Sequence, residues 1–108
     1  MAATFRLTLV QANPVVGALA ANAAAAHDAW KTGRAGGAQM VALPEMFLTG
    51  YQTQDLILKP AFVDAALAEL ARLAQACADG PALGIGGPAR VGARLYNAYH
   101  ILHEGRIA

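Results

Sequence analysis

Hydrophobic and polar positions in the first part of the chain change from a period of two to a helical period. Residues 5–10, Phe-Arg-Leu-Thr-Leu-Val, alternate and stop at Asn13-Pro14, which predicts a strand followed by a break. The next apolar residues recur on one face of a helix, at Leu19, Ala23, Ala26 and Trp30. The helix is predicted to end at the glycines that follow, Gly33, Gly36 and Gly37. Residues 40–43 are apolar on both faces, as in a buried parallel strand, so this part predicts β-α-β.

The second part of the chain predicts a further helix and two strands. Pro60 suits the first turn of the helix, and Gly80-Pro81 ends it. Its apolar stripe consists of Val63, Leu67, Leu70, Ala74 and Cys77. Residues 81–86 and 95–102 predict strands, with a loop between them, and residues 103–106 predict a hairpin turn that no return strand follows.

The order β-α-β-α-β-β predicts an α/β fold with two helices on one side of a mixed sheet. Four strands and two helices leave the sheet with an open edge and one face poorly covered. We therefore expect residues 1–108 to be the N-terminal portion of a longer domain. The alternative is a complete small domain with a frayed tail.

Composition limits the function classes. The 108 residues are enough for one domain, and 56% hydrophobic against 14% charged residues excludes a disordered chain. No apolar run is long enough to span a membrane, and the N-terminus has no secretory pattern, so we expect a cytoplasmic protein. A single cysteine excludes an internal disulfide framework. A net charge of +1 from scattered basic residues argues against nucleic acid as a partner.

One acidic residue, Glu45, lies in an apolar stretch of the sequence. Glu45 follows Pro44 just past the predicted strand 40–43 and precedes Met46-Phe47-Leu48. In α/β sheets, ligands bind outside the carboxyl ends of the strands. Desolvation by apolar neighbours would make Glu45 a stronger base, suited to general-base catalysis near neutral pH. A loop glutamate that points to water is the alternative.

The stretch "LPEMFLTGY" after an apolar strand resembles the first catalytic motif of the nitrilase superfamily of carbon–nitrogen hydrolases. "FRLTLVQANPVVG" resembles the opening strand of the same fold, an α-β-β-α sandwich. The continuation "GYQTQDLILKPAF" and the segment "RLYNAYHILHEGRIA" are similar to the glutaminase domains of the glutamine-dependent NAD synthetase family. Gln52 departs from that subgroup, which often has proline there.

The resemblance implies a mechanism in which a glutamate, a lysine and a cysteine hydrolyse an amide. Glu45 matches the glutamate, whereas Lys31 and Lys59 do not match the lysine, which with the nucleophile is expected beyond residue 108. Tyr51 would line the pocket for glutamine or another small amide, or else serve in packing. The resemblance implies no cofactor or metal in this segment, ATP and Mg²⁺ in a separate synthetase domain, no membrane partner, and a homo-oligomeric full-length protein.

Other candidate residues favour structural roles. Cys77 completes a helix stripe and is expected to be an inert buried thiol. Gly84 to Ala89, "GIGGPA", fits a loose dinucleotide fingerprint, but no helix follows it. His100 and His103 would point to opposite faces of a strand, and His27 to solvent, so no metal site is predicted.

Three functions therefore remain for this chain. The first is a glutaminase domain that supplies ammonia for ATP-dependent amidation of deamido-NAD, with residues 1–108 alone inactive. The second is a stand-alone amidase of the same superfamily. The third is a non-catalytic module that binds partners through its sheet edge and helices.

Overall fold

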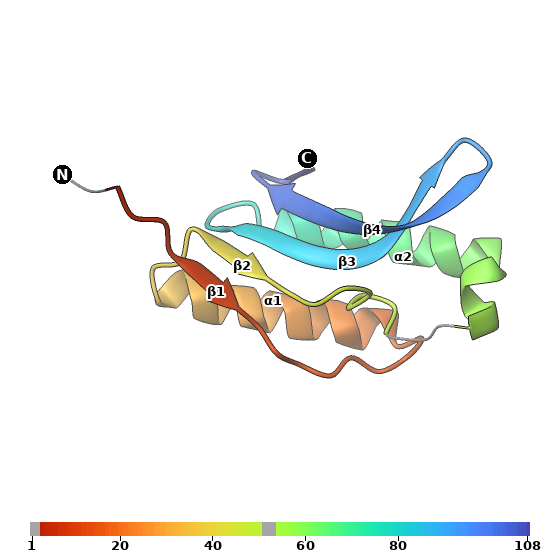
Figure 1. Ribbon diagram of the computed structural model, residues 1–108, viewed down its shortest axis with the longest axis horizontal. Coiled ribbons are helices and arrows are strands. Elements are labelled where there is room, and N and C mark those ends of the chain that lie inside the picture. The colour runs from red at the N-terminus through yellow and green to blue at the C-terminus, as the bar shows by residue number, and fades with distance from the viewer. Residues whose placement is uncertain (1–2, 51–53) are drawn as a thin grey trace.

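The computed structural model describes residues 3–50 and 54–108, which form one sheet with both helices on a single face (Figure 1). The elements are β1 (Leu7–Leu9), α1 (Leu19–Ala35), β2 (Met40–Ala42), the 3₁₀ helix η1 (Gln54–Leu58), α2 (Pro60–Ala76), β3 (Ala82–Val91), β4 (Arg94–His103) and β5 (Arg106–Ile107). The α/β class and the two-helix, one-sided arrangement predicted from the sequence are confirmed.

The strands lie in chain order, β1-β2-β3-β4-β5. The first three are parallel, and β3, β4 and β5 are antiparallel. Val41 pairs with Thr8 on one side and with Leu83 on the other, so β2 is central, as its continuous apolar run predicts. The mixed sheet therefore has a parallel beginning and an antiparallel end.

Both helices begin and end close to the predicted residues. α2 starts at Pro60 in its first turn, and its C-cap is Cys77. α1 ends at Ala35 with Gly36 as its C-cap. The buried residues of α2 include most of the predicted stripe, together with Ala66 and Leu73; Leu67 is only partly buried. A period of 3.6 residues thus located the face of α2 that packs on the sheet.

Trp30 joins α1 to the turn that precedes β3. Its ring is 2% exposed, and its indole Nε1 donates a hydrogen bond to the Pro81 carbonyl at 2.8 Å. The Arg34 guanidinium lies 5.4 Å from the ring centroid. On the sheet side the core consists of Val41, Leu83, Ile85 and Leu102, all at most 1% exposed. Burial of these large apolar side chains is the main source of stability for this face.

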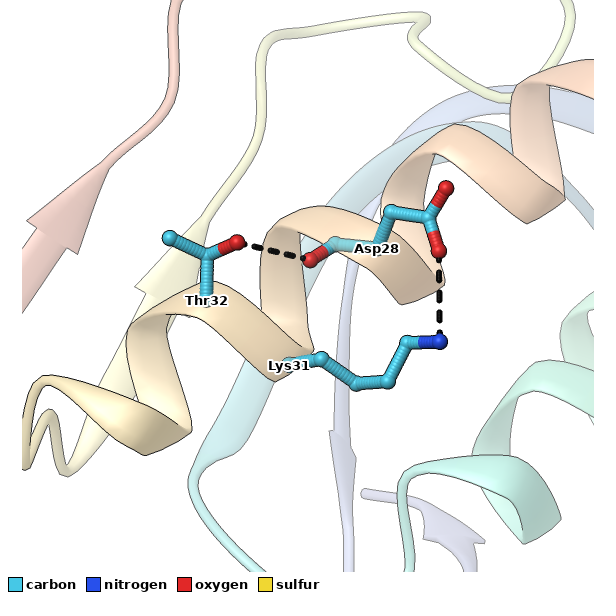
Figure 2. Close-up of polar contacts among 3 residues, drawn as sticks. All are labelled: Asp28, Lys31 and Thr32. Atoms are coloured by element: carbon cyan, nitrogen blue, oxygen red, sulfur yellow. Dashed lines mark hydrogen bonds and ion pairs between the residues drawn. The ribbon is translucent and has the colours of Figure 1, made fainter.

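The opposite side of α1 faces solvent. Lys31 Nζ lies 3.3 Å from the Asp28 carboxylate, and the Thr32 hydroxyl donates to the Asp28 carbonyl at 3.1 Å (Figure 2). More than half of each charged side chain is exposed, and ion pairs of this kind contribute about 0–1 kcal/mol. Lys31 is therefore a solvated residue of the helix surface.

The predicted loop after residue 86 is wrong, because β3 continues through Pro88 to Val91. Pairing between β2 and β3 stops at Gly84, so beyond that point β3 has β4 as its only strand partner among the described residues. Proline is tolerated at such an edge, where its missing N–H leaves no ladder bond unmade. The turn that connects β3 to β4 is short and falls at residues 92–93.

A return strand follows the turn at residues 104–105, contrary to the prediction. β5 pairs Arg106 with His103 and Ile107 with Leu102, and the Ala108 amide donates to the Ile101 carbonyl at 2.8 Å. Two paired residues are too short to produce a hydrophobic pattern, which is why periodicity did not find them.

The sheet face opposite the helices is open in the described residues. Phe5, Leu7 and Leu9 are 64%, 48% and 74% exposed. Leu7 and Leu9 pair with Met40 and Ala42, whose side chains lie on that same face. Within residues 3–50 and 54–108, neither helix is long and apolar enough to cross a membrane.

We expect Gly33→Ala to destabilise the contact between α1 and β2. A Cβ at Gly33 would lie 2.4 Å from Val41 Cγ2, so the overpacking should cost about 1–3 kcal/mol although alanine favours helices. Hydrogen–deuterium exchange of peptides that cover α1 and β2 would measure the loss.

Gly36→Ala is the matched control on the same helix. Its Cβ would meet backbone oxygens at 3.6 Å, an ordinary contact, and Gly36 has a φ of −82°. The free energy of local opening, obtained from hydrogen–deuterium exchange, should change by less than about 0.5 kcal/mol. Equal protection in both variants would contradict the tight approach of Gly33 to Val41.

Candidate active site

Glu45 lies at the edge where the parallel strands end. β2 stops at Ala42, and the Leu43 amide donates to the Gly84 carbonyl at 2.8 Å, which keeps the chain beside β3 for another residue. Pro44 follows, and its carbonyl accepts a hydrogen bond from the Gly86 amide at 3.3 Å. Glu45 is therefore held at the carboxyl end of a central strand, the usual place for a ligand site in an α/β sheet.

A tight turn follows Glu45 and separates it from its apolar neighbours. Met46 has a φ of +54°, and its carbonyl accepts a hydrogen bond from the Gly50 amide at 2.9 Å. Phe47 and Leu48 are at most 1% exposed and belong to the core, whereas Glu45 is exposed. The expected desolvation of Glu45 by these neighbours is wrong within the described residues, because the turn directs them to the opposite side.

Gly86 sets how close the turn lies to β3. A Cβ there would lie 2.1 Å from the Met46 amide nitrogen and 2.8 Å from the Glu45 Cα, so only glycine fits. The Gly86 carbonyl also accepts a hydrogen bond from the Leu48 amide at 3.1 Å. The segment "GIGGPA" is therefore part of strand β3, and Gly86 in it admits the turn. No helix follows the segment directly, so it does not form the dinucleotide site that its fingerprint would require.

Two side chains of β4 reach across β3 to the strand end. Asn97 Nδ2 donates to Glu45 Oε1 at 2.6 Å, and the Tyr99 hydroxyl donates to the Leu43 carbonyl at 2.9 Å. Burial raises the pKa of the Tyr99 hydroxyl, which therefore remains a neutral donor. A Cβ at Gly84 would lie 2.6 Å from the Tyr99 hydroxyl oxygen, so this glycine leaves room for the side chain.

Sequence reasoning did not identify Asn97 as a site residue. A usable signal was present, since Asn97 and Tyr99 are two residues apart on a strand and must share a face. The partner of that face could not be found from spacing, because Asn97 and Glu45 are 52 positions apart in the chain. The arrangement presents a carboxylate with Oε1 hydrogen-bonded to Asn97 and, among the residues that the structure describes, no side-chain hydrogen bond to Oε2.

A small cavity lies next to Met46 and Asn97, and Glu45 itself does not line it. Its volume is about 220 Å³, and its lining is mainly apolar, from Met46, Ile57, Leu95 and Tyr96, with Asn97 at its polar side. This is below the usual size of a site for a drug-sized ligand, although a small amide side chain would fit. Tyr51, the predicted substrate-binding residue, lies outside the described residues.

The other candidates lie away from the carboxylate or are buried. Lys31 pairs with Asp28 on α1, and Lys59 is the exposed N-cap of α2. Cys77 is 1% exposed, and burial raises the pKa of its thiol from 9.0 to about 11. A thiol in this state is a poor nucleophile, so the structure agrees with the expected packing role of Cys77.

The histidines of β4 face opposite ways, as predicted. His100 Nε2 lies 3.0 Å from the Pro88 carbonyl, while His103 is near Glu104 at 3.9 Å. His27 stacks at 5.8 Å from Trp30 on α1. In residues 3–50 and 54–108, histidine, cysteine and acidic side chains nowhere form a group of three that could hold a metal ion.

The chain resembles known proteins in sequence and in fold. Residues 6–107 match the carbon–nitrogen hydrolase family model. The chain is 63% identical to a glutamine-dependent NAD(+) synthetase of Rhodobacter capsulatus, over 95% of this chain and 19% of that protein. A glutamine-dependent NAD(+) synthetase of Xanthomonas campestris pv. campestris is 35% identical, over 96% of this chain and 19% of that protein. The chain thus spans about a fifth of the length of these relatives.

Solved structures give the same picture of the fold. A glutamine-dependent NAD(+) synthetase from Cytophaga hutchinsonii has a TM-score of 0.89 at 24% identity, over 97% of this chain and 18% of that one. An amidase from Nesterenkonia sp. has a TM-score of 0.79 at 22% identity, over 96% and 40%. The predicted nitrilase-like fold is confirmed.

We expect Cys77 to be nearly unreactive in the folded protein. With a pKa of about 11, only about 0.1% of the thiol is ionised at pH 8, against about 10% at 9.0. Alkylation by iodoacetamide should be at least about 100-fold slower than in urea, rising about tenfold per pH unit toward pH 11. Peptide mass spectrometry of Cys77 measures both rates; rapid native alkylation would contradict the buried placement.

Proposed function

The chain belongs to the carbon–nitrogen hydrolase family, and we propose that it forms part of the glutamine-hydrolysing domain of a glutamine-dependent NAD synthetase. The 63% identity to the Rhodobacter capsulatus synthetase, over nearly the whole chain, carries this proposal. The geometry supports it, since Glu45 stands just past the carboxyl end of a parallel strand, with Oε1 held by Asn97.

Glu45 is the general base of the proposed reaction. Its free oxygen, Oε2, takes the proton of a cysteine thiol supplied by the rest of the protein, and the thiolate attacks the side-chain amide carbon of glutamine. A lysine, also from the rest of the protein, stabilises the negative oxygen of the tetrahedral intermediate. The proton on Glu45 then passes to the departing nitrogen, which leaves as ammonia.

The remaining thioester is cleaved by water. Glu45 accepts a proton from the water as it attacks the acyl carbon, and the proton returns to the cysteine sulfur when glutamate leaves. The site is thereby restored, with no net change in protonation. The ammonia would serve ATP-dependent amidation of deamido-NAD in a separate domain, where ATP and Mg²⁺ bind.

A stand-alone amidase is the second candidate. The fold likeness to the Nesterenkonia amidase favours it, because that structure matches 96% of this chain. Both candidates use Glu45 in the same way. A Ser-Gly-Gly-x-Asp-Ser phosphate-binding loop in the rest of the protein would identify the synthetase, whereas a protein without one would be an amidase.

Glu45→Gln in the full-length protein should abolish glutamine hydrolysis. The amide keeps the shape of the carboxylate but cannot accept the thiol proton, so kcat should fall by about 10²–10⁴-fold. Synthesis of NAD from free ammonium should continue, because it needs no glutamine. Glutamate release and NAD formation, measured separately with each nitrogen source, distinguish these effects.

Glu104→Gln is the matched control, since it makes the same chemical change at an exposed residue of the β4–β5 turn. It should leave both activities unchanged. The proposed role of Glu45 is wrong if Glu45→Gln still hydrolyses glutamine at the rate of the parent enzyme.

A further inference from the structure

We propose that Asn97 is the positioning residue for the general base, fixing the Glu45 carboxylate so that its second oxygen meets the thiol. This role rests on the function proposed above. The hydrogen bond from Asn97 Nδ2 to Glu45 Oε1, at 2.6 Å, is the observation that carries it. Hydrogen bonds to a charged acceptor are shorter and stronger than neutral ones.

The backbone of Glu45 is fixed by the turn, but its side chain is not. The Pro44 carbonyl accepts a hydrogen bond from the Gly86 amide, and the Met46 carbonyl accepts one from the Gly50 amide. Glu45 itself is exposed, so packing alone leaves its side-chain torsions free. Among the described residues, Asn97 is the one side chain that hydrogen-bonds the carboxylate. It therefore supplies the constraint that the turn lacks.

Asn97 is itself held on a rigid element. β4 pairs along its length with β3, and Asn97 lies opposite Pro88. β3 is anchored in the core by Leu83 and Ile85, both fully buried. Gly86 admits the backbone of Glu45 and Met46 close to β3, which leaves the carboxylate within reach of the Asn97 side chain. A donor on a paired strand keeps its direction better than one on a loop.

The amide is chemically suited to this role. Asn97 donates a hydrogen bond but neither gains nor loses a proton near neutral pH, so it cannot compete with the thiol. A lysine or histidine here would offer a proton of its own to the base. With Oε1 occupied, Oε2 is the oxygen left to receive the thiol proton, and misplacement of a reacting group by about 1 Å can cost about 100-fold in rate.

The test compares Asn97→Ala and Asn97→Asp in the full-length enzyme. The first removes the donor, and the second keeps the shape but replaces the donor by an acceptor. For both, kcat for glutamine hydrolysis should fall by about 100-fold with KM changed less than about threefold. NAD synthesis from free ammonium should be unaffected.

Gln75→Leu separates positioning from the loss of any side-chain hydrogen bond. It removes a hydrogen bond of similar length, from Gln75 Nε2 on α2 to the Gly105 carbonyl at 2.9 Å, and it leaves the carboxylate contact intact. Its kcat should stay within about threefold of the parent enzyme. Equal losses in Gln75→Leu and the Asn97 variants, or loss of ammonium-dependent synthesis, would show a structural role and overturn the proposal.

A chemical readout checks that Asn97 acts through Glu45. Alkylation of the nucleophilic cysteine by iodoacetamide should be slower in Asn97→Ala and in Glu45→Gln, and no slower in the double variant than in Glu45→Gln alone. Additive effects would overturn the proposal. Unchanged glutamine hydrolysis in Glu45→Gln would instead overturn the proposed function, and unchanged hydrolysis in the Asn97 variants alone would overturn only the positioning role.

Discussion

The close approach of the turn after β2 to Gly86 of β3 determines where the carboxylate stands. A Cβ at residue 86 would meet the Met46 amide nitrogen at 2.1 Å, well inside any real contact. Because the two segments touch, the Leu48 amide can reach the Gly86 carbonyl at 3.1 Å. Leu48 is then fully buried, and Glu45 is left on the other side of the turn. Because Gly86 has no side chain, the turn can pack against β3 with Leu48 in the core and Glu45 at the surface.

The two faces of the sheet have different roles in the structure. Val41, Leu83 and Leu102 face the helices and are fully or almost fully buried. The opposite face carries the hydrogen bonds from Asn97 and Tyr99 to the strand end. Since side chains alternate along β4, the same strand contributes to both faces. The stability of the helical face therefore holds the donors of the open face in place.

Much of the fold could be predicted, because long periodic segments reveal themselves. The apolar stripe from Val63 to Cys77 marked α2, and the uniform run at residues 40–43 marked a central strand. The extension of β3 through Pro88 could not be predicted, because it depends on where β2 stops pairing. For the site, proximity in sequence indicated that Phe47 and Leu48 would surround Glu45. The positive φ of Met46 turns them away, and no local pattern encodes it.

The exposure of Glu45 bears on what these residues would contribute to the proposed reaction. A base that works on a thiol needs both a fixed position and surroundings from which water is excluded. Position is supplied here by Gly86 and Asn97, at contacts internal to one sheet. Exclusion of water is not supplied by the part of the chain that the structure describes, since Glu45 is exposed there. In the proposed enzyme, these residues span about a fifth of the length of the related synthetases. In that enzyme, the segments that would bring the thiol and the lysine would also have to desolvate Glu45, and this would couple assembly of the site to activation of its base.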